Sequence, residues 1–214
     1  MTGLVGKELN FIPSANCGLF LENEELRIAV GLRIGAPVCL PHDCICGGKV
    51  DALGHHCFVC RKGNGKQVRH SLLNDAIWRS FGRAKIQAQK EPTGMCFSLR
   101  KNDGSIANKR PDGASIVPWS RGRNIAWDVT VADTFAASYL PLTSVQAGAA
   151  AERAALLKTT KYEELARNHI FAPLACEVTG VWCQEAEDIF QELGRRISET
   201  TGDKRENLFL FEIV

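Results

Sequence analysis

Four cysteines and two adjacent histidines lie in the seventeen-residue stretch CICGGKVDALGHHCFVC, which runs from Cys44 to Cys60. Thiolates and imidazole nitrogens at such short spacings are typical of structural zinc sites, in which four ligands surround the ion tetrahedrally. Cys44, Cys46 and Cys60 are common to the two ligand sets that the spacing permits. The fourth ligand is either His55 or Cys57. Four protein ligands leave no open coordination position, so we predict a structural metal site.

Two aspartates further along the chain have the chemistry to hold a second, reactive metal ion. Asp112 belongs to the stretch RPDG, although Pro-Asp-Gly is also a common turn sequence. Asp128 stands inside the apolar stretch NIAWDVTV, where an unpaired charge is costly. If the two stretches pair as a hairpin, their carboxylates converge at one edge of a sheet. Mg²⁺, which prefers carboxylate oxygens, water and phosphate, would then relieve their repulsion.

Two lysines in the stretch KTTKYEEL could supply positive charge for the same chemistry. Lys158 and Lys161 are three residues apart on a predicted helix and therefore share a face. A lysine beside a metal-bound water can stabilise a hydroxide or the charge that develops on a phosphate. The alternative is a solvated helix face on which Glu163 and Glu164 are local partners.

The positive charge of the chain is concentrated in its middle. Residues 61–124 hold fourteen Lys and Arg against four Asp and Glu, a local charge of +10, whereas the whole chain carries +2. Such a segment favours a polyanionic partner, because neutralising phosphates drives nucleic-acid binding. A solvated basic face is the alternative.

The patterns of apolar residues predict a mixed α/β fold. A helix is expected over residues 23–35, with Asn23 as its N-cap, and the glycines at 63 and 65 indicate a flexible basic connector over residues 61–67. From residue 68 the predicted order is α-β-β-β-α-β-α, from the ranges 70–82, 84–92, 113–119, 124–133, 146–168, 170–182 and 186–202. The basic turn SRGR at Ser120–Arg123 would join the second and third strands as a hairpin.

Other features of the sequence exclude several classes of protein. No apolar run has the length of a membrane span, so no membrane partner is expected. The first residues lack the pattern of a secretion signal, and nine cysteines without one favour metal ligands and free thiols over disulfides.

The order of five motifs resembles a known nuclease domain. The motifs are the metal-ligand spacing C-x-C-x8-H-x4-C, VRH at Val68–His70, RPD, Asp128 in DVTV, and KxxKY. That nuclease domain is the restriction-like endonuclease domain of site-specific non-LTR retrotransposons, a branch of the PD-(D/E)XK superfamily that follows a CCHC zinc knuckle. The resemblance covers residues 36–202. It implies a restriction-endonuclease-like core, with a mixed central sheet flanked by helices.

The resemblance implies a function and a set of roles. The chain would nick target DNA with Mg²⁺ or Mn²⁺ held by Asp112 and Asp128, and the nick would supply the 3′ hydroxyl that primes reverse transcription. Lys158 or Lys161 would be the catalytic cation and Tyr162 an accessory residue. The alternative is a catalytically inactive, zinc-containing nucleic-acid-binding module derived from such an element.

The resemblance also favours His55 over Cys57 as the fourth zinc ligand. From the spacing of the Cys/His stretch itself, His42 and His56 are expected to lie at the surface or to support the ligands. Glu91 and Glu177 are candidate third acids. The residues expected to contact nucleic acid are Arg61, Lys62, Lys66, Arg69, His70, Lys109, Arg110, Arg121 and Arg123.

Two departures from the superfamily pattern concern single positions. In the superfamily a lysine commonly follows the second acid by two residues, and here that position is Thr130. The retrotransposon branch is similar, because its lysine lies on the next helix. The fifteen residues between Asp112 and Asp128 slightly exceed the usual interval.

The predicted organisation is a helical linker region over residues 1–35, a zinc knuckle with basic connector over 36–67 and the nuclease domain over 68–214. Because the chain has no Asp-Asp dipeptide, the polymerase motif of a complete element is missing, and we expect a detached module of such an element. Its partners would be double-stranded DNA and either element RNA or a reverse transcriptase domain acting in trans. Its location would be the nucleus.

Overall fold

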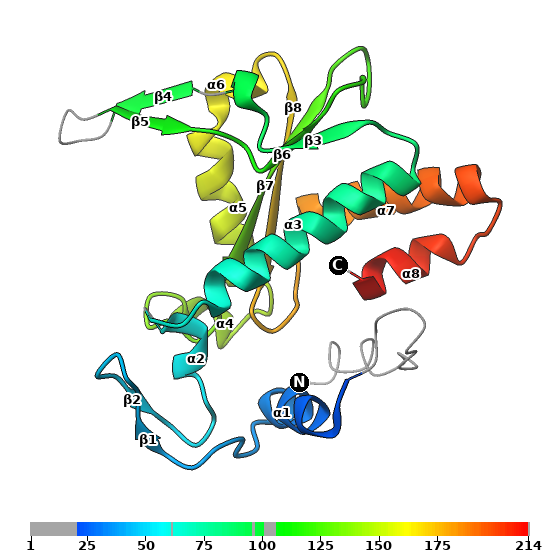
Figure 1. The fold of residues 1–214 in the computed structure, drawn as a ribbon. Helices are drawn as coiled ribbons and strands as arrows, with labels where there is room; N and C mark the ends of the chain where they lie inside the picture. Colours follow the sequence, from blue (N-terminus) through cyan, green and yellow to red (C-terminus); the bar gives the residue numbers. More distant parts are fainter. Residues whose placement is uncertain (1–20, 61, 96, 101–105, 214) are drawn as a thin grey trace. The chain divides into compact units, whose positions relative to one another are not determined.

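The computed structural model describes residues 21–213 except 61, 96 and 101–105 (Figure 1). The chain divides into two compact units whose boundary lies between Lys62 and Gly63. This boundary falls before residue 68, where the nuclease domain is predicted to begin. Arg61 and the first twenty residues of the predicted linker lie outside the described residues.

The first unit contains the helices α1 and α2 and, between them, a small hairpin. Helix α1 (Asn23–Ile34) begins with a reciprocal capping arrangement between Glu22 and Glu25 and is followed by the C-cap Gly35, whose φ of 68° favours glycine. The predicted helix is therefore present, but its N-cap is Glu22 and not Asn23. Strands β1 (His42–Asp43) and β2 (Lys49–Val50) pair antiparallel, and the short helix α2 (His56–Val59) follows.

The second unit is built on a mixed four-stranded sheet in the order β3-β6-β7-β8. Strands β3 (Ala88–Lys90), β6 (Gly113–Ser115) and β7 (Ile125–Ala132) are antiparallel neighbours, and β8 (Ile170–Glu177) runs parallel to β7. The predicted hairpin between β6 and β7 is present, with a bridge between Ser120 and Arg123 at its turn.

The parallel pair β7 and β8 requires a crossover connection, which helices supply. Helices α4 (Leu140–Thr143), α5 (Ala149–Lys161) and α6 (Glu163–Ala166) connect the two strands. The single helix predicted over residues 146–168 is in fact α5 and α6, separated at Tyr162.

Helices cover both faces of the sheet, because successive side chains of β7 point to opposite faces. Helix α3 (Gly65–Arg83) packs on one face, where the Phe81 ring stacks on that of Trp127 at 4.6 Å between centroids. Helix α7 (Gln184–Thr201) lies on the same side and buries Phe190, Leu193 and Ile197. Helix α5 lies on the other side, as Figure 1 shows.

Several elements of the second unit are additional to the predicted order. A hairpin of β4 (Phe97–Arg100) and β5 (Ile106–Lys109) follows the short 3-10 helix η2 (Thr93–Met95), and α8 (Glu206–Ile213) follows α7. Helix α3 begins at Gly65, so residues 65–67 form its first turn and are not a flexible connector. The broader prediction of an α/β class, with a mixed sheet flanked by helices, is confirmed. Among the described residues no helix is both long and apolar enough to cross a membrane.

Candidate functional site

The Cys/His stretch of the first unit gathers four metal-ligating side chains. Ligand atoms of Cys44, Cys46, His56 and Cys60 all lie within 4.8 Å of one another. The Sγ atoms of Cys44 and Cys60 are 3.6 Å apart, and Cys46 Sγ is 3.1 Å from His56 Nε2. Tetrahedral zinc with Zn–S of about 2.3 Å and Zn–N of about 2.0 Å separates such ligands by roughly 3.5–3.8 Å. The cluster therefore has the size and the donor set of a structural zinc site.

Local backbone geometry brings these ligands together. The turn after Cys44 is closed by a 2.8 Å hydrogen bond from the Gly47 amide to the Cys44 carbonyl, and the Gly47 φ of 86° favours glycine. A Cβ atom at Gly48 would lie 2.5 Å from the His56 ring, so this position must also stay without a side chain. The pKa of the Cys60 thiol is lowered to about 6, first because the backbone amide of Lys62 hydrogen-bonds it. A thiol that ionises readily is suited to binding metal.

The structure corrects the predicted identity of the fourth ligand. His56, four residues before Cys60, shares with it one face of the α2 turn. His55 instead places its Nδ1 atom 3.1 Å from the Asp51 carboxylate, and Cys57 is exposed and outside the cluster. The spacing is therefore C-x-C-x9-H-x3-C, with His56 as a ligand and not a supporting residue.

In the second unit, hydrogen bonds bring Asp112 next to Asp128. The Asp112 amide donates to the Trp127 carbonyl at 2.9 Å, and the Asp112 carboxylate accepts the Val129 amide at 2.7 Å. Asp112 is thus bonded to both neighbours of Asp128 in β7. Gly113 is required beside it, because a Cβ there would collide with the Trp127 ring.

Asp128 is almost completely buried and is held by two side chains from the crossover connection. Lys158 of α5 forms an ion pair with its Oδ2, and the Tyr162 hydroxyl hydrogen-bonds its Oδ1. A buried carboxylate requires such partners, because burial removes the water that would otherwise stabilise its charge. Burial first, and then Asp128, raises the pKa of Tyr162, so its hydroxyl stays protonated and can donate.

The second lysine of the KxxKY motif acts on Tyr162 and not on Asp128. Lys161 Nζ lies 3.1 Å from the Tyr162 oxygen and 4.4 Å from the centroid of its ring. The same oxygen is 3.0 Å from the Arg110 carbonyl, which links this motif to RPD. Burial, with the nearby positive charge of Lys158, lowers the pKa of Lys161.

Helix α3 holds Asp112 from the other side of the sheet. His70 Nε2 is 3.0 Å from the Asp112 carboxylate, which raises the pKa of His70 through their hydrogen bond. One turn later, the buried Asn74 donates to the Asp112 carbonyl at 3.2 Å and accepts the Trp127 indole N–H at 2.9 Å. Sequence analysis placed His70 among DNA contacts and missed Asn74. Their spacing of four residues is the signal that could have paired them.

The two candidate third acids have other partners. Glu91 is mostly exposed and forms an ion pair with Arg110. Glu177 is buried and accepts the Ala150 amide at the start of α5 at 2.9 Å. In the β7–β8 register Glu177 lies opposite Ala132, four residues and about 13 Å along the strand from Asp128. Among the described contacts, neither carboxylate touches Asp112 or Asp128.

The basic residues predicted to contact nucleic acid, as far as they are described, belong to several elements of both units. Lys62 belongs to the first unit and donates to the Ile45 carbonyl at 3.0 Å. In the second unit Lys66 and His70 line a pocket beside β7, Arg69 lines another, and Arg123 donates to carbonyls at Ala166 and His169. Lys109 and Arg110 stand just before Asp112, and Arg121 lies in the β6–β7 turn.

Comparisons with known proteins do not assign the chain to a family. No known family matches the sequence, and no curated protein matches it.

Proposed function

We propose that the second unit is a metal-dependent DNA endonuclease with a restriction-endonuclease-like core, of the kind found in non-LTR retrotransposons. One observation carries the proposal. Asp112, Asp128 and the Lys158–Tyr162 segment come from separate parts of the chain, yet Lys158 and Tyr162 bond the Asp128 carboxylate directly, and the Asp112 carboxylate accepts the amide of Val129 beside it. With Lys161, which contacts the Tyr162 oxygen, the arrangement offers two carboxylates and two lysines, side chains suited to metal-assisted phosphodiester hydrolysis.

The residues present fit a hard divalent cation. Asp112 and Asp128 would hold Mg²⁺ or Mn²⁺, because carboxylate oxygens are the ligands that these ions prefer. His70 and the Val129 amide both bond Asp112 Oδ2, no hydrogen bond to Oδ1 is found among the described residues, and the side chain is 20% exposed, so Oδ1 is the oxygen that a ligand would use. When bound, the ion would supply Lewis-acid activation of the phosphate and of an attacking water.

The proposed reaction is hydrolysis of one phosphodiester. The oxygen of a water molecule bonds to phosphorus, the bond from phosphorus to the 3′ oxygen breaks, and a proton passes to that oxygen to give a 3′ hydroxyl and a 5′ phosphate. Lys158 would stabilise the negative charge that develops on the phosphate. Tyr162, held by Lys161 and the Arg110 carbonyl, would orient Asp128.

The first unit and the basic segment would serve binding. A zinc-ordered knuckle and the positive residues from position 61 on would attach the chain to the DNA backbone. Element RNA or a reverse transcriptase domain in trans are the further proposed partners, and the nucleus is the proposed location.

Nicking of supercoiled plasmid in Mg²⁺ tests the proposal. Asp112→Asn and Asp128→Asn should each slow nicking by about 10³-fold or more, which corresponds to about 4 kcal/mol of barrier. Asp75→Asn, which alters an acid of α3 that pairs with Lys90, is the matched control and should nick like the parent chain. Salt-dependent DNA affinity should be retained in all three variants. Nicking by Asp112→Asn at the parental rate would reject the assignment.

A catalytically inactive nucleic-acid-binding module is the second candidate, and one observation favours it. Both oxygens of Asp128 have protein partners, and His70 engages Asp112 Oδ2, so Asp128 itself is satisfied without a metal ion. This candidate predicts salt-dependent DNA binding with no Mg²⁺-dependent nicking in the parent chain.

A further inference from the structure

A pocket of about 280 Å³ lies on β7 just beyond Asp128. Its lining comes from α3, β7 and α5, namely Lys66, Gln67, His70, Val129, Thr130, Val131 and Lys158. His70 and Lys158 also contact Asp112 and Asp128, whereas the two aspartates do not line the pocket. A group bound here would therefore be adjacent to the proposed reaction centre and not in it.

Positive charge dominates the lining. Lys66 is exposed, and no ion pair of Lys66 is found among the described residues. Lys66 and Gln67 stand in the first turn of the 19-residue helix α3, where the helix dipole also favours an anion. Lys158 contributes a second ammonium group from α5.

Thr130 provides an independent indication of a ligand. Its hydroxyl oxygen is buried, and no hydrogen-bond partner is found for it among the described residues. Leaving such a group unpaired is costly, and native proteins rarely do so. A bound group with acceptor oxygens that reached this hydroxyl would pair it together with the exposed Lys66 ammonium group, while Lys158 stays with Asp128.

We propose that this pocket is a subsite for a DNA phosphodiester close to the one that is cut. The inference rests on the proposed nuclease function and specifies how its substrate is held. His70 and Lys158 line the pocket and also contact Asp112 and Asp128, so a phosphate bound here would be a near neighbour of the scissile one. The pocket volume also leaves room for part of the attached sugar.

Thr130→Val is the decisive variant, because it removes the hydroxyl and keeps the shape of the side chain. In the free protein it should leave the melting temperature unchanged or higher, since the hydroxyl has no partner to lose. Its affinity for duplex DNA should fall about tenfold, because a hydrogen bond to a charged phosphate is lost. Thr130→Ser retains the hydroxyl and should bind DNA like the parent chain.

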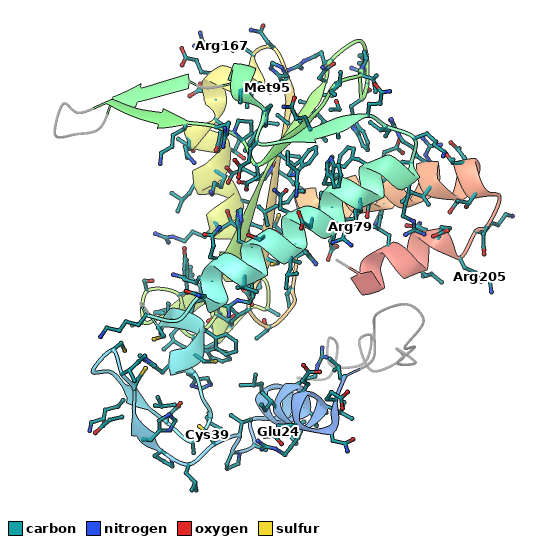
Figure 2. All side chains as sticks on the ribbon, in the orientation of Figure 1. Glu24, Cys39, Arg79, Met95, Arg167 and Arg205 are labelled. Atoms are coloured by element: carbon teal, nitrogen blue, oxygen red, sulfur yellow. The ribbon has the colours of Figure 1, made fainter. Side chains whose placement is uncertain are left out.

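Lys66→Ala tests the charge. The slope of log affinity against log salt should become less negative by about 1, as expected when one phosphate contact is lost. Arg79→Ala is the matched control, since Arg79 is exposed thirteen residues further along α3, about 20 Å away, and is labelled in Figure 2. Its salt slope should stay at the parental value. The Lys66 and Thr130 effects should be non-additive in the double variant, because both act on one phosphate.

The binding assay uses the full chain, duplex DNA and Ca²⁺, so that its outcome does not depend on cleavage. Parental affinity for Thr130→Val would overturn the pocket assignment, even if Asp112-dependent nicking is found. Loss of affinity in Thr130→Val together with no nicking by the parent chain would support the phosphate subsite and reject the nuclease.

Discussion

The choice between adjacent histidines in the Cys/His cluster gives the sharpest prediction from the structure. His56→Ala should lose zinc, whereas His55→Ala should retain it. His56 Nε2 lies 3.1 Å from Cys46 Sγ, within a set of four ligand atoms, while His55 faces Asp51. The two variants remove the same atoms one position apart, so differences in composition or in general helix propensity cannot explain a difference in zinc content.

The magnitude follows from the number of ligands. Structural zinc contributes about 10–16 kcal/mol in small sites, so each of four ligands accounts for about 2.5–4 kcal/mol. Loss of His56 should therefore weaken zinc binding by about 10²- to 10³-fold. Loss of His55 removes a side-chain contact to Asp51 outside the ligand cluster and should change the affinity by less than about tenfold.

Zinc content per chain after dialysis against a competing chelator measures this difference directly. The parent chain, His55→Ala and Cys57→Ser should each retain one zinc ion, and His56→Ala should retain little. The opposite pattern, with zinc lost from His55→Ala and kept by His56→Ala, would refute the ligand assignment. Equal loss from both histidine variants would refute it as well.

Three further variants test the second unit. Asn74→Ala should reduce the free energy of unfolding by about 1–3 kcal/mol in urea denaturation, because it leaves the Trp127 indole N–H buried and unpaired; an unchanged stability would contradict that role. Tyr162→Phe keeps the ring but removes the hydroxyl that binds Asp128, and nicking should fall about tenfold or more while plasmid binding is retained. Glu177→Gln keeps an acceptor for the first turn of α5 and should leave nicking per folded molecule unchanged; a large loss would return Glu177 to the metal site.

The β6–β7 hairpin shows how much of the sheet the sequence could predict. Apolar and β-branched residues of the two stretches indicated strands, and the turn SRGR supplied Gly122, which readily adopts its φ of 74°, whereas nothing in the sequence indicates the φ of 49° at Arg121. Because antiparallel neighbours joined by a short turn have few alternative registers, the approach of Asp112 to Asp128 was predictable from local patterns alone.

The fourth zinc ligand was not predictable by the same reasoning. His55 and His56 differ by one position, and both satisfy the general rule of two short-spaced ligand pairs. The choice depends on which side of α2 faces the cysteines, and a helix of four residues carries too few positions to show a periodic pattern. The first turn of α3 was missed for a related reason, since Gly63 and Gly65 lower helix propensity while tertiary packing of α3 on β7 outweighs it.

The contacts of Lys158 and Lys161 in the KxxKY motif distinguish two lysines that their spacing in the sequence cannot. Spacing places Lys158 and Lys161 on one helix face and cannot distinguish them. In the structure α5 ends at Lys161, so the backbone turns away from helical geometry at Tyr162 and the two ammonium groups reach different atoms. Lys158 meets the Asp128 carboxylate, whereas Lys161 meets the phenol oxygen that itself binds Asp128. In the proposed nuclease Lys158 is therefore the cation that touches the reacting group, and Lys161 acts through Tyr162. Thr130 occupies the strand position where the superfamily commonly has its lysine. Because Lys158 supplies the cation from α5, Thr130 can bind a neighbouring phosphate in the proposed nuclease.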